Sequence, residues 1–459
     1  MHYDLIVIGG GPAGYVGAIR AAQLGRKVAC VEKERAGGTC LNWGCIPTKS
    51  LLRNAELYHL MKHRAADFGF QVEGLSYDWG KVIKRSRDVS DKNAAGIEFL
   101  FKKNKVEYVR GEASLDKAGE VKVKLTSGKE ETHTADNILI STGVVSRPLP
   151  GLPFNGKTVI GSREAMILEP QPKRMIIIGA GAIGVEFAYF YNAFGTRVTL
   201  IEMMPDILPV EDTEVSKTLE KALSKQGIKI LTGTKTTKTE TTAKGVRVTV
   251  EGKSGETLEA DVCLVAIGVV PLLPGGKLKL ELTDRGYIAT DERYETSAKG
   301  IFAAGDIIGP PWLAHVASWE AIQAVEGMFG EIEPRKIRIF PGCTYCQPQV
   351  ASIGLTERAA KESGRKFRVG KFPFSASGKA RAIGETEGFV KLIIAEPHGE
   401  ILGAHIIGPE ATEMIAELGI AMTLEATYEE IEATIHAHPT LSESVHEAAG
   451  QAFGHAIHI

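Results

Sequence analysis

Two cysteines, Cys40 and Cys45, stand in the segment Gly-Thr-Cys-Leu-Asn-Trp-Gly-Cys-Ile-Pro-Thr-Lys at residues 38–49. In an ideal helix, residues five positions apart lie about 8–9 Å from each other at Cα, whereas a disulfide needs Cα atoms within about 7 Å. A bridge therefore requires a distorted turn, which Gly44 and Pro47 permit. Strained, accessible disulfides tend to be catalytic, and a position near a helix start would favour the Cys45 thiolate. The alternative is two buried thiols that never meet.

An apolar strand near the start of the chain leads into Gly9-x-Gly11-x-x-Gly14, and Glu32 ends the next apolar run. A dinucleotide-binding fingerprint requires a definite context, which is a strand, a glycine turn, a helix, a second strand and an acid, and this segment supplies it. Gly9 allows the tight turn, Gly11 lets the backbone approach a pyrophosphate, and Gly14 lets helix and strand pack closely. The helix N-terminus supplies amide donors to the phosphates, and Glu32 is expected to accept from ribose hydroxyls. The accompanying strand and acid disfavour a coincidental glycine loop.

The same unit occurs again as the strand Met175–Ile178, then Gly179-x-Gly181-x-x-Gly184, and finally Glu202. In both copies the acid lies 18 positions after the third glycine. Two fingerprints indicate two dinucleotides or one repeat that has lost its ligand, and the complete second copy favours two. The first copy leads into the cysteine pair, so its cofactor should exchange electrons with sulfur, as a flavin can. The second should hold NAD, because Glu202 would repel the 2′-phosphate of NADP.

Four further segments complete a resemblance to a known family. They are Ser141-Thr142-Gly143, the run from Gly300 to Asp306, Leu313-Ala314-His315, and His436-Ala437-His438-Pro439-Thr440-Leu441-Ser442-Glu443. From residue 3 to about residue 450 the chain resembles the dihydrolipoamide dehydrogenase family, which are FAD-dependent class I pyridine nucleotide-disulfide oxidoreductases. The resemblance implies an α/β fold with two Rossmann-like dinucleotide-binding domains, for FAD and for NAD, and a C-terminal α+β interface domain. It also implies an NAD-dependent, FAD-containing enzyme that oxidises protein-bound dihydrolipoamide to lipoamide through a redox-active Cys40–Cys45 disulfide.

The resemblance assigns roles to the reactive side chains. Cys40 would be the interchange thiol that attacks or releases the lipoyl sulfur, and Cys45 the thiol nearer the flavin. His438 would be the base that deprotonates the incoming dithiol, with Glu443 orienting its ring and favouring its cationic form. The alternatives for His438 are a structural or helix-capping histidine, or a metal pair with His436. The other motifs argue against both, so no metal is expected.

The resemblance also implies which residues hold the cofactors. Lys49 and Glu186 would pair beside the isoalloxazine, where a cation stabilises charge on the reduced flavin; ordinary solvated helix charges are the alternative. The residues expected to hold FAD are Gly9, Gly11, Pro12, Ala13, Gly14, Glu32, Lys33, Gly38, Thr39, Cys40, Cys45, Lys49, Gly111, Glu112, Ala113, Ser141, Thr142, Gly143, Asp306, Leu313, Ala314 and His315. Those expected to hold NAD are Gly179, Gly181, Ile183, Gly184, Glu186, Glu202 and Gly268.

Composition limits the class of protein. The chain has 459 residues, 44% of them hydrophobic and 24% charged, which is typical of a globular protein with several cores. Its net charge of −2 argues against a broad basic field for nucleic acid. No apolar run approaches the ~20 residues of a membrane span, and Met1 leads almost directly into the first strand, which argues against a signal peptide. Six cysteines are few for a secreted disulfide scaffold, so a cytoplasmic location is expected.

The cysteines outside the pair have plainer explanations. Cys30 and Cys263 fall within apolar strands and are expected to be core residues. Cys343 and Cys346 form Cys-Thr-Tyr-Cys, but no second ligand pair follows with the spacing of a zinc site. The family usually lacks cysteines there, so incidental thiols are expected, with a secondary redox role as the alternative.

The motifs divide the chain into domains. Residues 1–145 are expected to form the first part of the FAD-binding domain, with long helices over 50–66 and 80–104 and strands over 105–140. Residues 146–272 are assigned to the NAD-binding domain, 273–340 to the second part of the FAD or central domain, and 341–459 to the dimerisation or interface domain. The family works as a homodimer in which each catalytic histidine serves the disulfide of the partner chain, and its macromolecular partner is a lipoyl-bearing protein of a 2-oxo acid dehydrogenase complex or of the glycine cleavage system.

The sequence departs from the family at one position near NAD, and three rival functions are considered. Val269 stands where the family commonly has an arginine near NAD, so NAD affinity is expected to be altered. A glutathione reductase would have arginines at and after Glu202, and a mercuric reductase would end in a cysteine pair; this chain has neither feature. A flavin-bound scaffold that no longer turns over is the rival outside enzymes, and the presence of Cys40, Cys45 and His438 argues against it.

Overall fold

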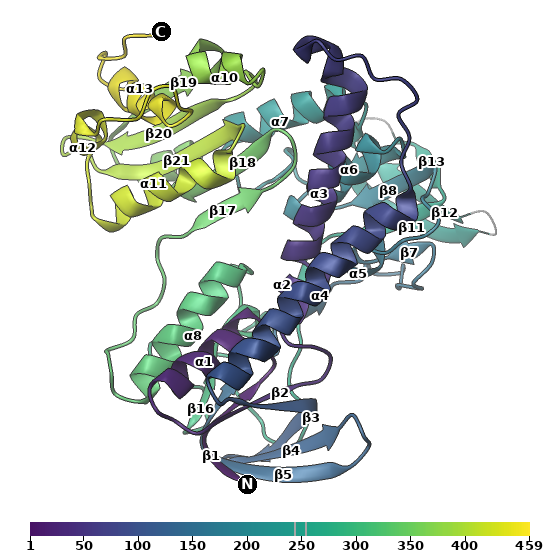
Figure 1. Ribbon diagram of the computed structural model, residues 1–459, viewed down its shortest axis with the longest axis vertical. Helices are drawn as coiled ribbons and strands as arrows, with labels where there is room; N and C mark the ends of the chain where they lie inside the picture. Colours follow the sequence, from purple (N-terminus) through teal and green to yellow (C-terminus); the bar gives the residue numbers. More distant parts are fainter. Residues whose placement is uncertain (243–244, 253–254) are drawn as a thin grey trace. The chain divides into compact units, whose positions relative to one another are not determined.

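The computed structural model describes residues 1–242, 245–252 and 255–459. By their contacts the described residues form two compact units. The first unit comprises Met1–Ser50, Gly80–Arg147 and Gly268–Arg338, and the second comprises Leu51–Trp79, Pro148–Ile267 and Ile339–Ile459. Figure 1 shows both helices and strands throughout the chain.

A parallel sheet is the frame of the first unit. Its strands are β3 (Glu107–Lys117), β2 (Val28–Glu32), β1 (His2–Ile8), β5 (Glu130–Ile140) and β16 (Ile301–Ala303), in that spatial order. β2 is buried along its whole length, as expected for a parallel strand covered on both faces. Cys30 lies within β2 and is fully buried, which confirms its expected place in the core.

The two longest strands of this unit each serve two sheets. Beyond Arg110, β3 pairs antiparallel with β4 (Glu120–Leu125), and β4 pairs with the first part of β5. Gly111 stands at the change of partner, where an added Cβ would lie 2.7 Å from the Lys124 carbonyl oxygen. The expected strands over 105–140 are therefore confirmed, and a turn at Gly128 joins β4 to β5. A short ribbon of β6 (Val144–Ser146) and β15 (Val269–Pro271) also belongs to this unit.

Helices cover this sheet and carry the motifs. They are α1 (Pro12–Gln23), α2 (Gly38–Trp43), α4 (Trp79–Lys103), the short 3-10 helix η3 (Asp306–Ile308) and α8 (Ala314–Met328), while α3 (Cys45–His59) begins in this unit. The buried residues of α4 are Ile83, Ser86, Ser90, Ala94, Ile97 and Phe101. They recur every three or four positions, the period that places one face of a helix on a core. The expected helices over 50–66 and 80–104 are confirmed, with a π-helical turn at Leu60–Arg64 and a 3-10 turn at Ala65–Phe68 following α3.

A second parallel sheet lies in the second unit. Its strands, in spatial order, are β10 (Lys229–Leu231), β9 (Arg197–Ile201), β8 (Arg174–Ile178), β14 (Val262–Val265) and β7 (Val159–Ile160). The accompanying elements are α5 (Ser162–Ala165), α6 (Ala182–Ala193), α7 (Thr213–Lys225), β11 (Lys235–Thr242), β12 (Gly245–Glu251) and β13 (Thr257–Ala260). Cys263 is fully buried in β14, as expected.

The C-terminal part of the second unit is built on an antiparallel sheet. Its strands, in spatial order, are β17 (Pro341–Thr344), β18 (Gln349–Gly354), β21 (Ile401–Gly408), β20 (Phe389–Ala395) and β19 (Phe367–Pro373). Its helices are α9 (Glu357–Glu362), α10 (Gly378–Ala382), α11 (Ala411–Thr423), α12 (Tyr428–Ala433) and α13 (Glu443–Gln451), with a 3-10 turn at Phe374–Ala376. β20 and β21 are buried along their whole length, because α11 and α13 pack against one face of this sheet while Ala360 of α9 packs with side chains of the other face and α7 contacts β21. The predicted α/β fold with a C-terminal α+β part is confirmed.

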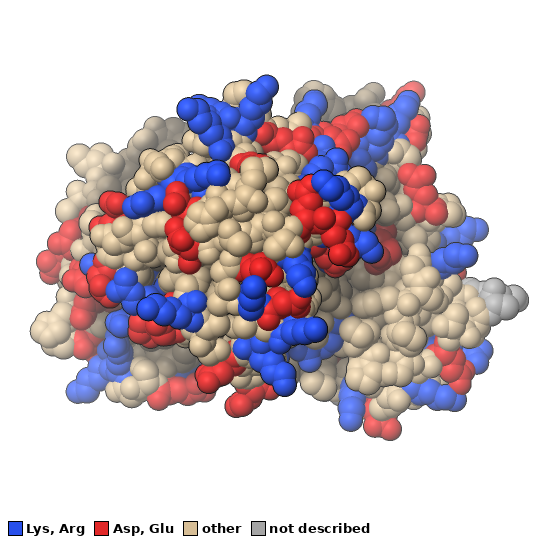
Figure 2. Space-filling view, turned by 90° about the horizontal axis from the view of Figure 1, so that it is seen from below, with Lys and Arg blue, Asp and Glu red and all other residues tan. Residues whose placement is uncertain are grey.

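Two surface properties bear on function. Figure 2 shows basic and acidic side chains interspersed over the face that it presents. In the described ranges of the chain, no helix is both long enough and apolar enough to cross a membrane.

Candidate functional site

The cysteine pair lies where one helix stops and the next begins. Cys40 is in α2, Gly44 has φ −147° and ψ −115° and breaks the helical path, and Cys45 is the first residue of α3. An added Cβ at Gly44 would lie 3.1 Å from the Thr39 carbonyl oxygen and 3.4 Å from Cys40 Cα, so the turn closes tightly around this glycine. The distorted turn and the helix start expected at Cys45 are both present.

Both members of the pair are thiols in the structure, with Cys40 half-buried and Cys45 exposed. The pKa of the Cys40 thiol is raised, first by its hydrogen bond to the Cys45 sulfur and then by burial, while Lys49 acts in the opposite direction. Cys40 therefore keeps its proton in the presence of Cys45. Cys45 begins α3, and the N-terminus of a helix favours a thiolate at that position.

The first glycine loop has the geometry of a phosphate cradle. Gly9 has φ +101°, and an added Cβ there would lie 2.4 Å from the Ser141 carbonyl oxygen; at Gly14 it would lie 1.8 Å from the Gly9 carbonyl oxygen. Gly11 is the residue before the first turn of α1, which begins with Pro12 and Ala13. Glu32 accepts hydrogen bonds of 2.7 Å from the amides of Gly10 and Glu34, and each oxygen keeps a lone pair for a ribose hydroxyl.

Two polar side chains lie beside this loop, Thr142 and Asp306. The Thr142 hydroxyl is buried without a protein partner, whereas the Ser141 hydroxyl donates to backbone carbonyls. Burial raises the pKa of Asp306 to about 6, opposed by a hydrogen bond from its own backbone. Gly143 follows with φ +70°. A buried hydroxyl without a partner calls for one, and a hydroxyl of the ribityl or ribose part of FAD suits Thr142.

The other residues expected at FAD occupy defined positions in the first unit. Lys33 and Thr39 are exposed, Gly38 lies at the start of α2, and Lys49 is half-buried on α3. Gly111, Glu112 and Ala113 lie in β3 at the change of sheet. Leu313 caps α8, whose first residues are Ala314 and His315.

The second glycine loop has nearly the same backbone geometry as the first at its first and third glycines. Gly179 also has φ +101°, and an added Cβ at Gly184 would lie 1.9 Å from the Gly179 carbonyl oxygen. Glu202 accepts from the amides of Ala180 at 2.7 Å and Met204 at 2.9 Å. An added Cβ at Gly181 would meet no atom within 4 Å, whereas one at the corresponding Gly11 would lie 3.9 Å from Gly38 Cα.

The remaining residues expected at NAD divide between the two units, with Ile183 and Glu186 on α6 of the second unit and Gly268 in the first unit. Ile183 is exposed on α6, and Gly268 has φ +101°. Glu186 is buried on α6 and accepts a 3.0 Å hydrogen bond from the Tyr345 amide. Val269 lies half-buried in β15, where its carbonyl accepts from Arg147.

The C-terminal motif forms an imidazole–carboxylate pair in the second unit. His438 Nδ1 lies 2.8 Å from Glu443 Oε1, and the other carboxylate oxygen accepts from the Thr440 amide. Partial burial raises the pKa of Glu443, but the Thr440 amide and the His438 ring bring the pKa below its usual range. The His438 side chain is 81% exposed, so its second ring nitrogen is accessible to an incoming reactant.

Three residues near these sites were missed by the sequence reasoning. Tyr15 follows Gly14 on α1; burial and then the two cysteines raise the pKa of its hydroxyl, which places it beside the pair. Asn42 is buried in α2 and donates to the Ala36 and Gly38 carbonyls. His436 binds Glu417 of α11. Each had a signal in the sequence, because Tyr15 lies next to the fingerprint, Asn42 lies between the two cysteines and His436 stands in the C-terminal motif, but none of these signals indicated the contact that the structure shows.

The Cys-Thr-Tyr-Cys segment shows no metal geometry. Cys343 lies in β17 and packs against the C-terminal core, while Cys346 is fully buried and donates to the Pro348 carbonyl. Among residues 1–242, 245–252 and 255–459, no cluster of three His, Cys, Asp or Glu side chains could hold a metal ion.

Comparison with known proteins identifies the family. Residues 3–321 match the pyridine nucleotide-disulphide oxidoreductase family, and residues 340–449 match its dimerisation domain, so the chain belongs to this family. A dihydrolipoyl dehydrogenase of Chlorobaculum parvum is 48% identical over 98% of this chain and 96% of the relative. A dihydrolipoyl dehydrogenase of Bacillus subtilis is 44% identical over 100% of this chain and 99% of the relative. LpdA of Mycobacterium tuberculosis has a TM-score of 0.89 at 27% identity, covering 97% and 98% of the two chains. The flavoprotein disulfide reductase RclA of Escherichia coli has a TM-score of 0.86 at 26% identity, covering 98% and 99%.

Proposed function

We propose that the protein oxidises protein-bound dihydrolipoamide to lipoamide and passes the electrons through FAD to NAD+. The observation that carries this proposal is the Cys40–Cys45 pair across a helix break, in the same unit as the first dinucleotide loop. The relatives named dihydrolipoyl dehydrogenase, which match this chain over nearly its full length, support it.

The residues around the first loop suit FAD. Gly9, Gly11 and Gly14 leave room for the pyrophosphate at the start of α1, Glu32 suits the ribose, and Thr142 and Asp306 offer polar atoms to the ribityl chain. When bound, FAD supplies two-electron transfer between the cysteine pair and the nicotinamide.

The side chains of the protein carry out the sulfur chemistry. His438 takes a proton from one thiol of dihydrolipoamide, and the resulting thiolate attacks Cys40 Sγ of the oxidised pair. A mixed disulfide forms and Cys45 leaves as a thiolate, stabilised by the start of α3. The second dithiol sulfur then attacks the lipoyl sulfur of the mixed disulfide and displaces Cys40, whose thiolate takes up the proton that this second thiol releases. Lipoamide is released and the pair has gained two electrons.

The assembly follows from the dimerisation domain. We propose a homodimer in which His438 of each chain serves the cysteine pair of the other, with a lipoyl-bearing protein of a 2-oxo acid dehydrogenase complex or the glycine cleavage system as partner. The domain assignment of 1–145 and 273–340 to FAD, 146–272 to NAD and 341–459 to the interface is part of this proposal, supported by the separate sheets of these segments. A cytoplasmic location is proposed from the low cysteine content.

The test uses the purified holoenzyme with dihydrolipoamide and NAD+. His438→Gln is expected to lower dihydrolipoamide oxidation by about 10²–10⁴-fold, the usual contribution of a general base. Electron flow from NADH to an artificial dye does not need the dithiol step and should be largely spared. Turnover with glutathione disulfide or Hg(II) in place of lipoamide would favour the rival reductases, and flavin-loaded protein without any turnover would favour the scaffold.

A further inference from the structure

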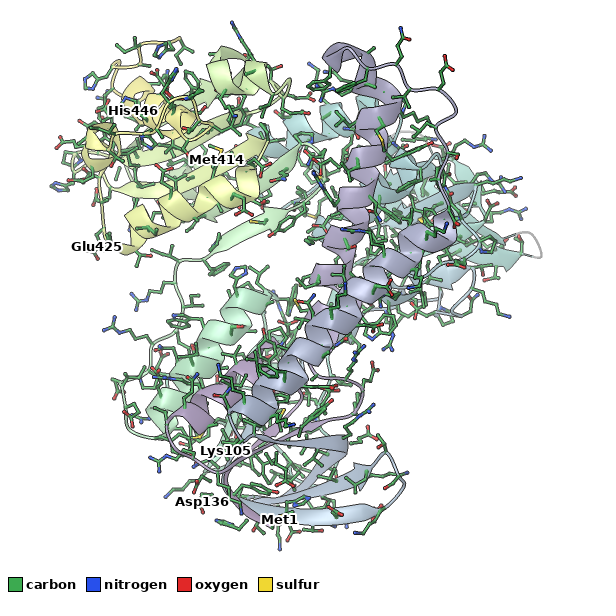
Figure 3. All side chains as sticks on the ribbon, viewed as in Figure 1. Met1, Lys105, Asp136, Met414, Glu425 and His446 are labelled. Carbon is green, nitrogen blue, oxygen red and sulfur yellow. The ribbon has the colours of Figure 1, made fainter. Side chains whose placement is uncertain are left out.

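A lysine side chain is buried in the C-terminal part of the second unit. Lys391 lies in β20, and its side chain is 2% exposed. Its neighbours along the strand, Val390 and Leu392, pack into the core that also contains Met414 of α11, which Figure 3 labels. Successive side chains of a strand point to opposite faces of a sheet. Lys391 therefore points to the face of the sheet that is turned away from α11.

The Lys391 ammonium group joins the starts of two helices. It donates to Asp212 Oδ1 at 2.9 Å and to Glu357 Oε2 at 2.7 Å. Asp212 is the N-cap of α7, where its carboxylate accepts from the Glu214 amide, and it also accepts from the Glu357 amide at the first residue of α9. Burial opposes the charge on Lys391 and on Asp212, but their hydrogen bonds outweigh it, raising the pKa of Lys391 and lowering the pKa of Asp212. The C-terminal sheet thus holds the start of α7 through a charged pair.

The start of α7 is tied in turn to the second glycine loop. The Leu208 amide donates to the Ala180 carbonyl oxygen at 2.8 Å, and the Leu208 carbonyl accepts from the Ser216 hydroxyl of α7. Leu208 is buried and has φ +43°, a strained conformation for a side chain of this size, which persists only where the surroundings hold it. Residues 208–212 therefore form a short connection between the loop and α7.

This connection fixes the direction of an amide in the loop. A peptide unit is planar and trans, so its N–H and its C=O point in opposite directions. The bond from Leu208 to the Ala180 carbonyl therefore sets the direction of the Gly181 N–H, which belongs to the same peptide unit. The first loop uses the same device with another donor, because the Gly10 carbonyl accepts from the Gly37 amide at 2.8 Å. Both loops thus hold their amides in place from behind.

We propose that Lys391 is a positioning residue for NAD, which holds Asp212 at the start of α7, keeps residues 208–212 in place and so directs the amides of the second loop toward the dinucleotide. The inference rests on the proposed function, in which the second loop binds NAD. The sulfur chemistry does not involve Lys391, so its loss should affect the NAD half of the reaction alone. Its loss also leaves a buried carboxylate unpaired, which destabilises a folded protein.

Three variants of the holoenzyme separate positioning from stability. Lys391→Met should raise the KM for NAD+, and the calorimetric Kd of NAD+ for the oxidised enzyme, by about 3–30-fold. Its kcat at saturating NAD+ and the rate at which dihydrolipoamide reduces its flavin should be retained. Lys391→Met combined with Asp212→Asn removes the unpaired carboxylate, so it should regain melting temperature but keep the high KM. Leu392→Ala leaves a cavity on the opposite face of β20, which costs stability, and should leave the KM for NAD+ unchanged.

Hydrogen exchange is a readout that does not depend on activity. Exchange over residues 208–212 should be faster in Lys391→Met and in the double variant than in the unmodified holoenzyme, because the start of α7 is no longer held. An unchanged KM and Kd for NAD+ in Lys391→Met overturns the inference, and so does a double variant whose KM returns to normal together with its melting temperature. The double variant carries the test where the single variant does not fold. The proposed function fails separately, if the unmodified holoenzyme transfers no electrons from dihydrolipoamide to NAD+.

Discussion

The two glycine loops share one local geometry and differ in what covers them. In each, the first glycine has φ +101°, the third lies against the carbonyl of the first, and an acid accepts two backbone amides. The first loop is overlaid by the start of α2, where an added Cβ at Gly38 would lie 2.5 Å from Gly11 Cα. The corresponding glycine of the second loop, Gly181, meets no atom within 4 Å of an added Cβ.

This difference in what lies against the two loops suggests that one suits a cofactor that stays bound and the other a cofactor that exchanges. The start of α2 packs against a glycine of the first loop, and α2 also carries Cys40. We therefore expect the first loop to suit a cofactor that stays bound and exchanges electrons with sulfur. An added Cβ at Gly181 meets no atom within 4 Å, so we expect the second loop to suit a dinucleotide that enters and leaves in each cycle. One backbone design is then expected to serve a resident cofactor and an exchanging one.

The largest expected effect tests whether the covered loop and the cysteines form one redox unit. Cys45→Ser should abolish dihydrolipoamide turnover and the long-wavelength absorption band that a thiolate gives against oxidised flavin after two-electron reduction. Cys40→Ser should abolish turnover but preserve or enhance the band, because Cys45 can no longer pair. Absorption spectra recorded during reduction of the two variants measure the band. A band that survived Cys45→Ser would reverse the assignment of the two thiols.

The next prediction tests the contact of Gly38 with the first loop by two alanine substitutions, one at Gly38 and one at Gly181 of the second loop. Gly38→Ala places a methyl group 2.5 Å from the Gly11 backbone at φ +56°, and should cost about 2–5 kcal/mol of unfolding free energy with loss of FAD. Gly181→Ala has space and should leave the melting temperature and FAD content unchanged while raising the KM for NADH. The flavin-to-protein absorbance ratio and thermal unfolding measure both. Equal behaviour of the two variants would remove the distinction between the loops.

A smaller effect concerns the ligand of the open loop. The Glu202 carboxylate would face the 2′-phosphate of NADPH, so NADH should have the higher kcat/KM. Glu202→Arg should narrow that preference by about one to a few kcal/mol, the scale of a hydrogen bond to a charged group. Glu32→Arg is the counterpart in the covered loop and should affect flavin content instead. An unmodified enzyme with equal kcat/KM for both nucleotides would contradict the assignment of NAD.

The smallest prediction uses the Asp306 carboxyl group beside the first loop. Burial raises the pKa of Asp306 to about 6, above the ~3.9 of an unfolded chain. Folded apoprotein therefore loses stability as pH rises from about 4 to about 6, because the buried carboxylate must ionise. Asp306→Asn should raise the melting temperature of the apoprotein by a few degrees at pH 7.5, with the gain fading toward pH 4, and should weaken FAD retention. A gain that did not depend on pH would point to packing instead.

The sequence predicts local motifs well and tertiary partners poorly. Both fingerprints, their acids and the helix start at Cys45 follow from residues close together in the chain. The cover of Gly38 on Gly11 could not be predicted, because the two residues belong to separate helices brought together by folding. The partner of His436 was missed for the same reason, since Glu417 lies 19 positions earlier on another helix.

The double use of β3 and β5 has a consequence for how the first unit comes apart. Each strand pairs within the parallel sheet along one part of its length and with β4 along the other part, so we expect the two ladders to open together although they use largely different residues. Hydrogen exchange at β4 amides, distant in the chain from either glycine loop, should therefore occur only through the opening that also frees β1 and releases the cofactor.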